Sequence, residues 1–217
     1  MLYAPQYISG AGYVTMLSVV NLNVAEGTVT LRLIGDDGAQ IGQTKEETIK
    51  GRGKLRITDQ NYFVNAEGQV ISGYVEIRSN GVRLAGDVVF GDPAKEQFGS
   101  SLPLVSELLE AMVFGHAVMN ETYWTGMAVL NPGESEAEIT INLYDRMGNL
   151  IREKHETIAP RRRTIGVMTQ YFPGVVEEGF QQGYMTVTSS RGVASFALFG
   201  NGTKFLSAIP PQVVPEE

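Results

Sequence analysis

The chain repeats itself at a distance of 110 residues. Residues 17–41 read LSVVNLNVAEGTVTLRLIGDDGAQI, and residues 127–151 read MAVLNPGESEAEITINLYDRMGNLI. The two stretches align without a gap, and 9 of the 29 positions from Tyr13/Tyr123 to Ile41/Ile151 are identical. A duplication this regular predicts two similar domains of about 100 residues, each long enough to bury a core of its own.

Within each copy the apolar residues alternate with polar ones. Residues 28–33 read TVTLRL, and their counterparts 138–143 read EITINL. Such alternation places Val29, Leu31 and Leu33 on one buried face of a strand, whereas a helical period of 3.6 residues fits neither copy. Further strands are predicted at 14–20, 40–49, 53–58, 70–78 and 82–90, with counterparts in the second half.

Four recurring residues are expected to be structural. Gly38 and Gly148 occupy the same place after this strand and suit a hairpin turn that needs a positive φ. Asn21 and Asn131 each end an apolar strand, and an Asn side chain can bond the backbone two residues on and hold the turn. These positions therefore favour a conserved shape over a shared chemistry.

About seven short strands per 100 residues, separated by Gly and Asn-Gly, are typical of an antiparallel sandwich or barrel. We predict an all-β protein made of two tandem antiparallel β-sandwich domains related by internal duplication, with Ig-like and jelly-roll topologies both open. The expected domains are residues 1–105 and 112–217. The linker 106–111 begins with a Ser cap followed by good helix formers, which predicts a turn or two of helix. A linker this short predicts packed domains and a monomer.

The composition excludes several classes of function. The chain has 17 basic and 24 acidic residues, a net charge of −7, which argues against a nucleic-acid partner. There is no cysteine, so disulfides, zinc thiolate sites and cysteine nucleophiles are excluded. No apolar run approaches the roughly 20 residues of a membrane span, and no membrane insertion is expected. Neither a cofactor nor a metal is expected.

Several motifs of the second copy resemble a known repeat. They are Phe114-Gly115-His116-Ala117, the stretch YWTGMAVLNP at 123–132, Leu143-Tyr144-Asp145, and GVASFALFG at 192–200. Together they are similar to a poorly characterised β-sandwich repeat of bacterial exported and surface proteins, which has no established activity. The first copy matches more loosely, with Leu22 in place of the Pro that usually follows the Asn. The resemblance implies an extracellular, cell-surface or periplasmic location and a binding or architectural role. The first ten residues contain no export signal.

The two histidines suggest no catalytic site. His116 aligns with Gln6, so we expect a structural ring that hydrogen-bonds to loop backbone. His155 alternates with charged residues and is expected on a solvated strand face. Two histidines without cysteine are a poor basis for a transition-metal site. No Gly-x-Ser-x-Gly motif occurs, and no partner motif accompanies either histidine.

Two groups of residues are candidates for ligand binding. Tyr123 and Trp124 could stack on sugar rings, although Trp124 aligns with Val14, which favours packing. The run Arg161, Arg162 and Arg163 is either a solvated strand entry or a contact for an acidic polysaccharide.

From these observations we predict a non-catalytic extracellular structural, adhesion or assembly module of a bacterial exported protein, with a glycan or a protein as partner. The first alternative is a carbohydrate-binding module that uses Tyr123, Trp124 and the three arginines. The second is a sandwich-fold hydrolase or lyase, which requires a cleft that collects His116 and at least two carboxylates.

Overall fold

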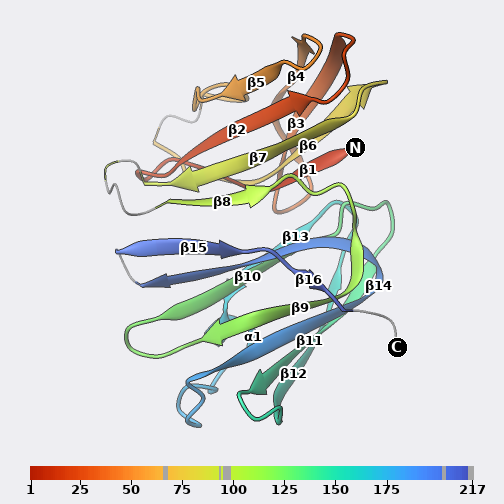
Figure 1. Cartoon of the computed structure of the whole chain (residues 1–217). Coiled ribbons are helices and arrows are strands. Elements are labelled where there is room, and N and C mark those ends of the chain that lie inside the picture. The colour runs from red at the N-terminus through yellow and green to blue at the C-terminus, as the bar shows by residue number, and fades with distance from the viewer. Residues whose placement is uncertain (66–67, 93, 95–98, 202–203, 215–217) are drawn as a thin grey trace. The chain divides into compact units, whose positions relative to one another are not determined.

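The computed structural model describes residues 1–217 except 66–67, 93, 95–98, 202–203 and 215–217 (Figure 1). It divides into two compact units, Met1–Ser106 (unit 1) and Glu107–Glu217 (unit 2). Apart from one short helix, α1 (Met168–Tyr171), the regular structure is antiparallel β-sheet. The predicted all-β fold of two tandem antiparallel sandwiches is therefore confirmed. No helix in the described ranges is long and apolar enough to span a membrane.

Unit 1 consists of two four-stranded sheets. Their strand orders are β1-β6-β3-β4 and β5-β2-β7-β8. The strands are β1 (Leu2–Ser9), β2 (Val14–Asn21), β3 (Gly27–Gly35), β4 (Gln40–Ile49), β5 (Lys54–Ile57), β6 (Ile71–Asn80), β7 (Leu84–Gly91) and β8 (Gly99–Pro103).

Unit 2 repeats this arrangement with the long strand β14 (Gln182–Asn201) in place of two strands, and it also contains α1 and the short strand β16. The first half of β14 pairs with β11 and β9 in one sheet, and its second half pairs with β10 and β15 in the other. The remaining strands are β9 (Leu109–Val118), β10 (Trp124–Leu130), β11 (Ala137–Asp145), β12 (Leu150–Ile158), β13 (Arg163–Val167), β15 (Phe205–Ile209) and β16 (Gln212–Val213).

The strand orders of the two units correspond throughout. Unit 2 has β12-β11-β14-β9 and β13-β10-β14-β15, where β14 replaces both β6 and β7. The correspondence extends to the last residues of each copy: Val105 bridges to Tyr3 in unit 1, and Gln212 pairs with Val113 in unit 2. Tyr3 and Val113 are 110 positions apart, so the duplication covers both complete sandwiches.

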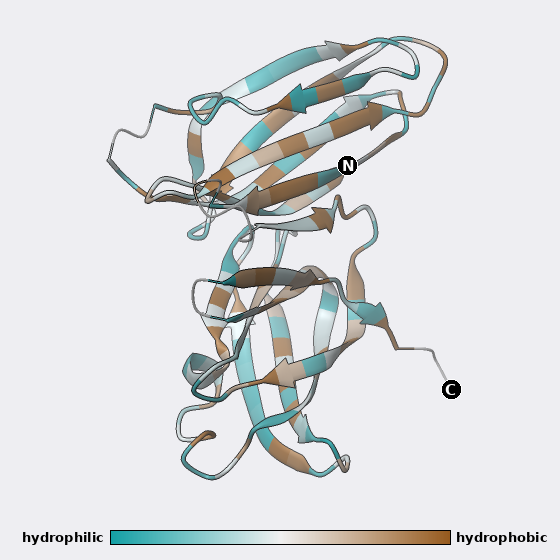
Figure 2. Cartoon of the chain, turned by 60° about the vertical axis from the view of Figure 1, so that its left-hand side comes forward, coloured by the Kyte–Doolittle hydropathy of each residue, from teal (hydrophilic) through white to brown (hydrophobic). Residues whose placement is uncertain are grey.

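The alternating residues form the cores. Val29, Leu31 and Leu33 are fully buried, and so are their counterparts in β11, as the sequence pattern predicts. Figure 2 shows hydrophobic and hydrophilic residues alternating along the strands. Burying each such side chain contributes about 1.5–3 kcal/mol, which makes this pattern the main local determinant of the sandwich.

Asn21 and Asn131 occupy equivalent buried positions and make equivalent hydrogen bonds. The Nδ2 of Asn21 donates to the carbonyls of Ala25, Ile49 and Lys50 at 2.8, 3.2 and 3.3 Å. The Nδ2 of Asn131 donates to those of Ser135, Ile158 and Ala159 at 2.8, 2.9 and 3.3 Å. Each Oδ1 also accepts from the backbone N–H two residues on. Each Asn therefore joins the end of one strand to the end of another.

The hairpin glycines have the conformation that their turns require. Gly38 has a φ of 82° and Gly148 a φ of 86°, both in the left-handed region. A hydroxyl recurs in the same way: the Oγ1 of Thr15 accepts from the N–H of Ile8 at 2.9 Å, and the Oγ1 of Thr125 accepts from that of Val118 at 2.9 Å. The residues that the two copies share thus bind backbone.

The helix predicted at residues 106–111 is wrong. Strand β9 begins at Leu109, so the last three residues of the expected linker belong to a strand. Leu109 pairs with Val193 and packs against the core, and Met112 is fully buried. Pairing and burial outweigh the helix propensity of this stretch, because propensity alone is worth less than 1 kcal/mol per residue.

Candidate functional site: the loop end of unit 2

Three loops of unit 2 lie at the same end of its sandwich. Residues 119–123 follow β9, residues 146–149 join β11 to β12, and residues 172–181 precede β14. They are neighbours because Val118 pairs with Gln182, and Asp145 pairs with Gly183. We call this region the loop end.

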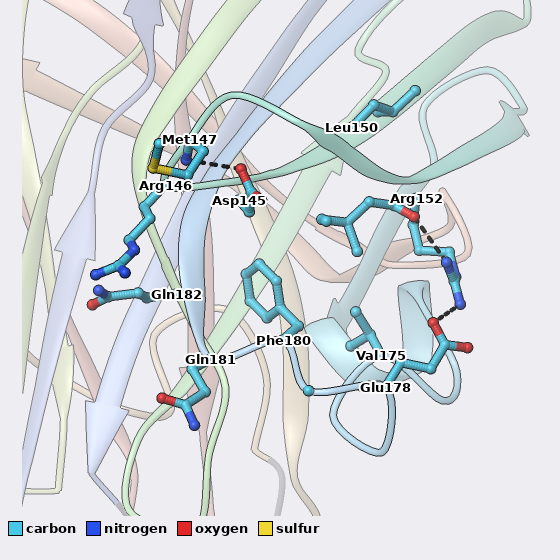
Figure 3. Close-up of a pocket in the computed structure, with 12 residues that line it drawn as sticks. Asp145, Arg146, Met147, Leu150, Arg152, Val175, Glu178, Phe180, Gln181 and Gln182 are labelled. Carbon is cyan, nitrogen blue, oxygen red and sulfur yellow. Dashed lines mark hydrogen bonds and ion pairs between the residues drawn. The ribbon is translucent and has the colours of Figure 1, made fainter.

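A cleft of about 550 Å³ opens at the loop end between the 146–149 hairpin and the 172–181 segment. This volume lies within the range of about 300–1,000 Å³ that is usual for small-molecule sites. Figure 3 shows Arg146, Gln181 and Gln182 toward one side of the cleft and the ion pair of Arg152 with Glu178 toward the other.

Two apolar side chains of the 172–181 segment line the cleft, and backbone hydrogen bonds within this segment hold it together. Val175 and Phe180 are buried. The N–H of Phe180 donates to the carbonyl of Val175 at 3.1 Å, and that of Gly179 donates to Val176 at 2.9 Å. These bonds hold the 172–181 segment in one shape, so the cleft is formed before any ligand arrives.

The carboxylate of Asp145 holds the hairpin turn. Its Oδ1 accepts from the N–H groups of Met147 and Asn149 at 2.8 and 2.9 Å, and its Oδ2 accepts from the Asn149 side chain at 2.8 Å. The bond from the Asn149 side chain, with the backbone bonds, lowers the pKa of Asp145 below its usual value. Asp145 is therefore a structural anion.

The cleft is lined by two arginines and two carboxylates, but only one of the arginines is in an ion pair with a described residue. Arg152 pairs with Glu178 and also donates to the carbonyl of Ile151 at 2.8 Å. Arg146, in contrast, makes no ion pair with any residue that the structure describes. Beside it, Met147 is 76% exposed. The cleft thus combines a guanidinium without a counter-charge with exposed aliphatic surface.

A second hollow of about 460 Å³ adjoins the first. It lies between residues 119–123 and the same 172–181 segment, and it shares Gly179, Phe180 and Gln181 with the cleft. The N–H of Met119 donates to the carbonyl of Gln181 at 3.2 Å, which ties the two loops together. The two hollows therefore flank one piece of backbone.

An aromatic cluster stands beside the second hollow. The ring of Tyr123 stacks on Phe199 with 5.5 Å between centroids and 30° between planes, and Phe205 lies 5.2 Å from Phe199. The ring of His116 meets Phe199 edge to face at 4.5 Å. Tyr123 remains 36% exposed, so the cluster presents an aromatic ring to solvent.

His116 does not have the environment that its alignment with Gln6 predicts. Gln6 is buried, whereas His116 is exposed, and no hydrogen bond of its ring occurs among the described residues. Both lie at an irregularity of the first strand, between Ala4 and Tyr7 in β1 and at the matching point in β9. The irregularity is therefore shared by the two copies, whereas the burial of the side chain within it is not.

The other residues predicted to bind a ligand, Trp124 and the three arginines, do not form one continuous surface. The Trp124 indole is partly buried, packs against the core, and leaves no room for a Cβ on Gly200, which would lie 2.5 Å from its Cζ2. Arg162 is exposed, but Arg163 is only 5% exposed within β13, so the run is not one basic patch. A binding role for these residues stays a prediction.

The structure also forms a hydroxyl–imidazole–carboxylate chain that the sequence does not reveal. The Oγ1 of Thr140 lies 2.9 Å from Nδ1 of His155, whose Nε2 lies 3.0 Å from Oε1 of Glu153. The chain lies on an exposed sheet face, and β11 is paired on both sides, so its N–H groups are used by ladders and offer no oxyanion hole. Within the described ranges, no three His, Asp or Glu side chains are placed to hold a metal ion.

The loop end differs between the two copies. In unit 1, Gly42 has a φ of 66°, and the N–H of Gln43 donates to the carbonyl of Phe63 at 3.1 Å, which holds the connecting segment against β4. Unit 2 has Arg152 at the position of Gly42, with its side chain paired to Glu178. The wall of the cleft at Arg152 is therefore built differently from the equivalent place in unit 1. The residues of the cleft lie on separate loops without a motif, which is why the sequence alone does not identify them.

The fold and the loop end define a tandem β-sandwich protein with a loop-lined cleft in its second unit. No protein-family model and no curated protein sequence matches the chain. Among solved structures, a β-glucuronidase from glycoside hydrolase family 2 aligns over 97% of this chain and 24% of its own, with 8% identity and a TM-score of 0.20. A calcium-binding mutant of Bacteroides uniformis β-glucuronidase 2 aligns over 94% and 25%, with 11% identity and a TM-score of 0.19. The chain thus spans about a quarter of each.

Proposed function

We propose that the protein is a non-catalytic adhesion module of an exported bacterial protein, in which two sandwiches form the scaffold and the loop end of unit 2 makes the contact. The proposal rests on one difference between the copies: they share residues that hold the backbone of the sandwich, but they do not share the residues at the loop end. Asn21 and Asn131 make the same backbone bonds, whereas Gly42 and Arg152 differ at the loop end. Binding residues commonly lie on loops that a rigid scaffold positions.

The carboxylates of the cleft support a binding role over a catalytic one. Asp145 accepts three hydrogen bonds within its turn, and Glu178 is paired with Arg152. His116, which the hydrolase or lyase alternative requires beside two carboxylates, does not line the cleft. A general acid or base needs a proton that it can exchange with a substrate, and both cleft carboxylates already have partners.

The exported location rests on the motifs of the second copy, above all YWTGMAVLNP and GVASFALFG. The test is to raise antibodies against the chain and apply them to intact cells of the producing bacterium, before and after protease treatment of the unbroken cells. We expect labelling of intact cells that the protease abolishes. Labelling that requires lysis in the untreated cells and survives the protease would contradict the proposal.

The non-catalytic part has a separate test. The full chain is incubated with chromogenic glycosides, esters and uronate polymers, and the variant Glu178→Gln serves as the matched control. We expect no turnover above the rate in buffer for either protein. Turnover by the wild type that Glu178→Gln removes would establish an enzyme instead.

Carbohydrate binding is a second candidate, and one observation favours it. Tyr123 presents an exposed ring whose position is fixed by stacking on Phe199. Rigid exposed aromatic rings are suited to stacking against the apolar face of a sugar. This version uses Tyr123 without Trp124, whose indole packs against the core.

A further inference from the structure

We infer that the two hollows of the loop end form one elongated groove that binds a linear acidic saccharide, with Tyr123 stacking on one sugar ring and Arg146 binding a carboxylate further along the chain. This inference rests on the proposed role of the loop end as the contact surface. The hollows share Gly179, Phe180 and Gln181, so a single extended ligand can lie across this segment and occupy both.

The first contact is the ring of Tyr123. It is 36% exposed, and its stacking on Phe199 at 5.5 Å fixes the ring before binding. The loop that holds it is also fixed, because the Oδ1 of Asn120 accepts from the N–H groups of Thr122 and Tyr123 at 2.9 and 2.8 Å. A preformed aromatic surface loses little conformational entropy when a ligand binds.

The middle of the groove supplies polar groups. The side chains of Gln181 and Gln182 are exposed, and neither is hydrogen-bonded to a described residue. A primary amide carries two donors and a carbonyl acceptor, which matches sugar hydroxyls that donate and accept. The backbone of Gln181 is held by the bond from Met119, so these amides project from a fixed segment.

Arg146 lies at the far end of the groove, in the same turn as the carboxylate of Asp145, which accepts three hydrogen bonds within that turn. Arg146 has no ion-pair partner among the described residues, and its guanidinium can bind a carboxylate through two parallel hydrogen bonds. Its neighbour Met147 offers aliphatic surface for the carbon face of a sugar. Unit 1 has Asp36 and Asp37 at these two positions, so an aspartate of unit 1 stands where unit 2 has Arg146.

The size and charge of the groove favour a saccharide over other polyanions. The hollows measure about 550 and 460 Å³, within the range for small ligands. A net charge of −7 repels densely charged nucleic acid, which requires many cationic contacts. A saccharide with spaced carboxylates needs only one guanidinium for each carboxylate that it binds. The carboxylates of the groove are Glu121, Asp145 and Glu178, of which Asp145 is bonded within its turn and Glu178 is paired with Arg152. The repulsion from charges outside the groove is screened beyond about 8 Å at physiological salt.

The test uses the full chain on an array of galacturonate, glucuronate and sialylated oligosaccharides, each beside its carboxyl-reduced neutral form, followed by calorimetry with the best binder. Arg146→Asp installs the residue that the first copy has in the same turn, so it should preserve the hairpin. Tyr123→Ala removes the ring. Arg191→Gln is the matched control, because Arg191 is an exposed arginine that lines neither hollow. Melting temperatures are recorded for all variants.

We expect at least one acidic oligosaccharide to bind about tenfold or more tightly than its neutral form, which corresponds to about 1.4 kcal/mol. Arg146→Asp should abolish this preference, Tyr123→Ala should weaken binding of both forms, and Arg191→Gln should behave as the wild type. Equal binding of acidic and neutral forms, no binding at all, or an undiminished preference in Arg146→Asp would overturn the inference. Any of these results leaves the surface-labelling and turnover tests unaffected, so failure here is distinct from failure of the adhesion proposal.

Discussion

Gly183 lies so close to the carbonyl oxygen of Tyr144 that a Cβ on Gly183 would come within 1.8 Å of it. The same contact occurs in the first copy, where a Cβ on Gly73 would lie 2.0 Å from the carbonyl oxygen of Ile34. In each unit this glycine lets the central strand approach its neighbour where the first strand is irregular. The recurrence explains why Gly73 and Gly183 are both present in the duplicated sequence.

Gly183→Ala should strongly destabilise unit 2, by about 3 kcal/mol or more, because the obstacle is backbone and cannot rotate away. Gly148→Ala is the control: its φ of 86° is strained for alanine, but its Cβ would meet open space, so the cost should be about 1–2 kcal/mol. Urea unfolding followed by the fluorescence of Trp124, the single tryptophan, reports on unit 2. Equal costs for the two variants would contradict this account.

Asn131→Ala should cost about 3–5 kcal/mol in unit 2. The change leaves three carbonyls without their donor and one N–H without its acceptor, and each buried polar group left unpaired costs about 1–3 kcal/mol. Asn21→Ala should do the same to unit 1, measured by hydrogen exchange of its strands. Asn61→Ala is the matched control, because that side chain is exposed, and its cost should stay below about 0.5 kcal/mol. A small effect of Asn131→Ala would contradict the structural role.

Tyr171 should make unit 2 sensitive to alkaline pH. Burial raises the pKa of Tyr171 to about 12, and its hydroxyl donates to the carbonyl of Met127 at 3.2 Å. The unfolded chain ionises first, near pH 10, so stability is complete below that pH and is lost as the pH rises toward 12. By pH 11 the loss from this group should be about 1–1.5 kcal/mol.

The measurement compares urea unfolding of the wild type and Tyr171→Phe at pH 8 and pH 11, followed by circular dichroism. The Phe variant should lose less stability between the two pH values, because it has no phenol to ionise. Burial also raises the pKa of Tyr7 and Tyr62, so both proteins should retain some alkaline decline. If the two declines are equal, Tyr171 does not titrate as described.

The pairs Arg32–Glu76 and Arg152–Glu178 should differ in strength because they differ in burial. Arg32 lies 3.4 Å from Glu76, which is only 7% exposed, so Arg32→Ala should cost about 1–3 kcal/mol by removing a positive charge that faces a buried carboxylate. Both partners of the Arg152–Glu178 pair are well exposed, so Arg152→Ala should cost less than about 1 kcal/mol. Hydrogen exchange of each unit gives the two costs. A larger cost for Arg152→Ala would contradict this ranking.

The sequence predicts the strands well because their signal is local. Residues 28–33 were expected as a strand and lie within β3, where Val29, Leu31 and Leu33 are fully buried, since one face of an alternating segment must be buried. The first residues of β9 were mistaken for a helix, because Leu109 gains its burial from a partner strand far along the chain. The loop end was missed for the same reason: Arg146 and Gln181 lie 35 positions apart, and only the folded backbone brings them to one groove.

Strand β14 has a consequence for how unit 2 comes apart. In unit 1 the two sheets contain separate strands, β6 in one and β7 in the other, joined by a turn at Gly81. New chain ends introduced at that turn would leave the hydrogen bonds of both sheets intact. In unit 2 a single continuous strand supplies a central member of both sheets. Circular permutation should therefore be tolerated at Gly81 and not near Arg191. Unit 2 should also unfold in a single cooperative transition in which both of its sheets are lost together.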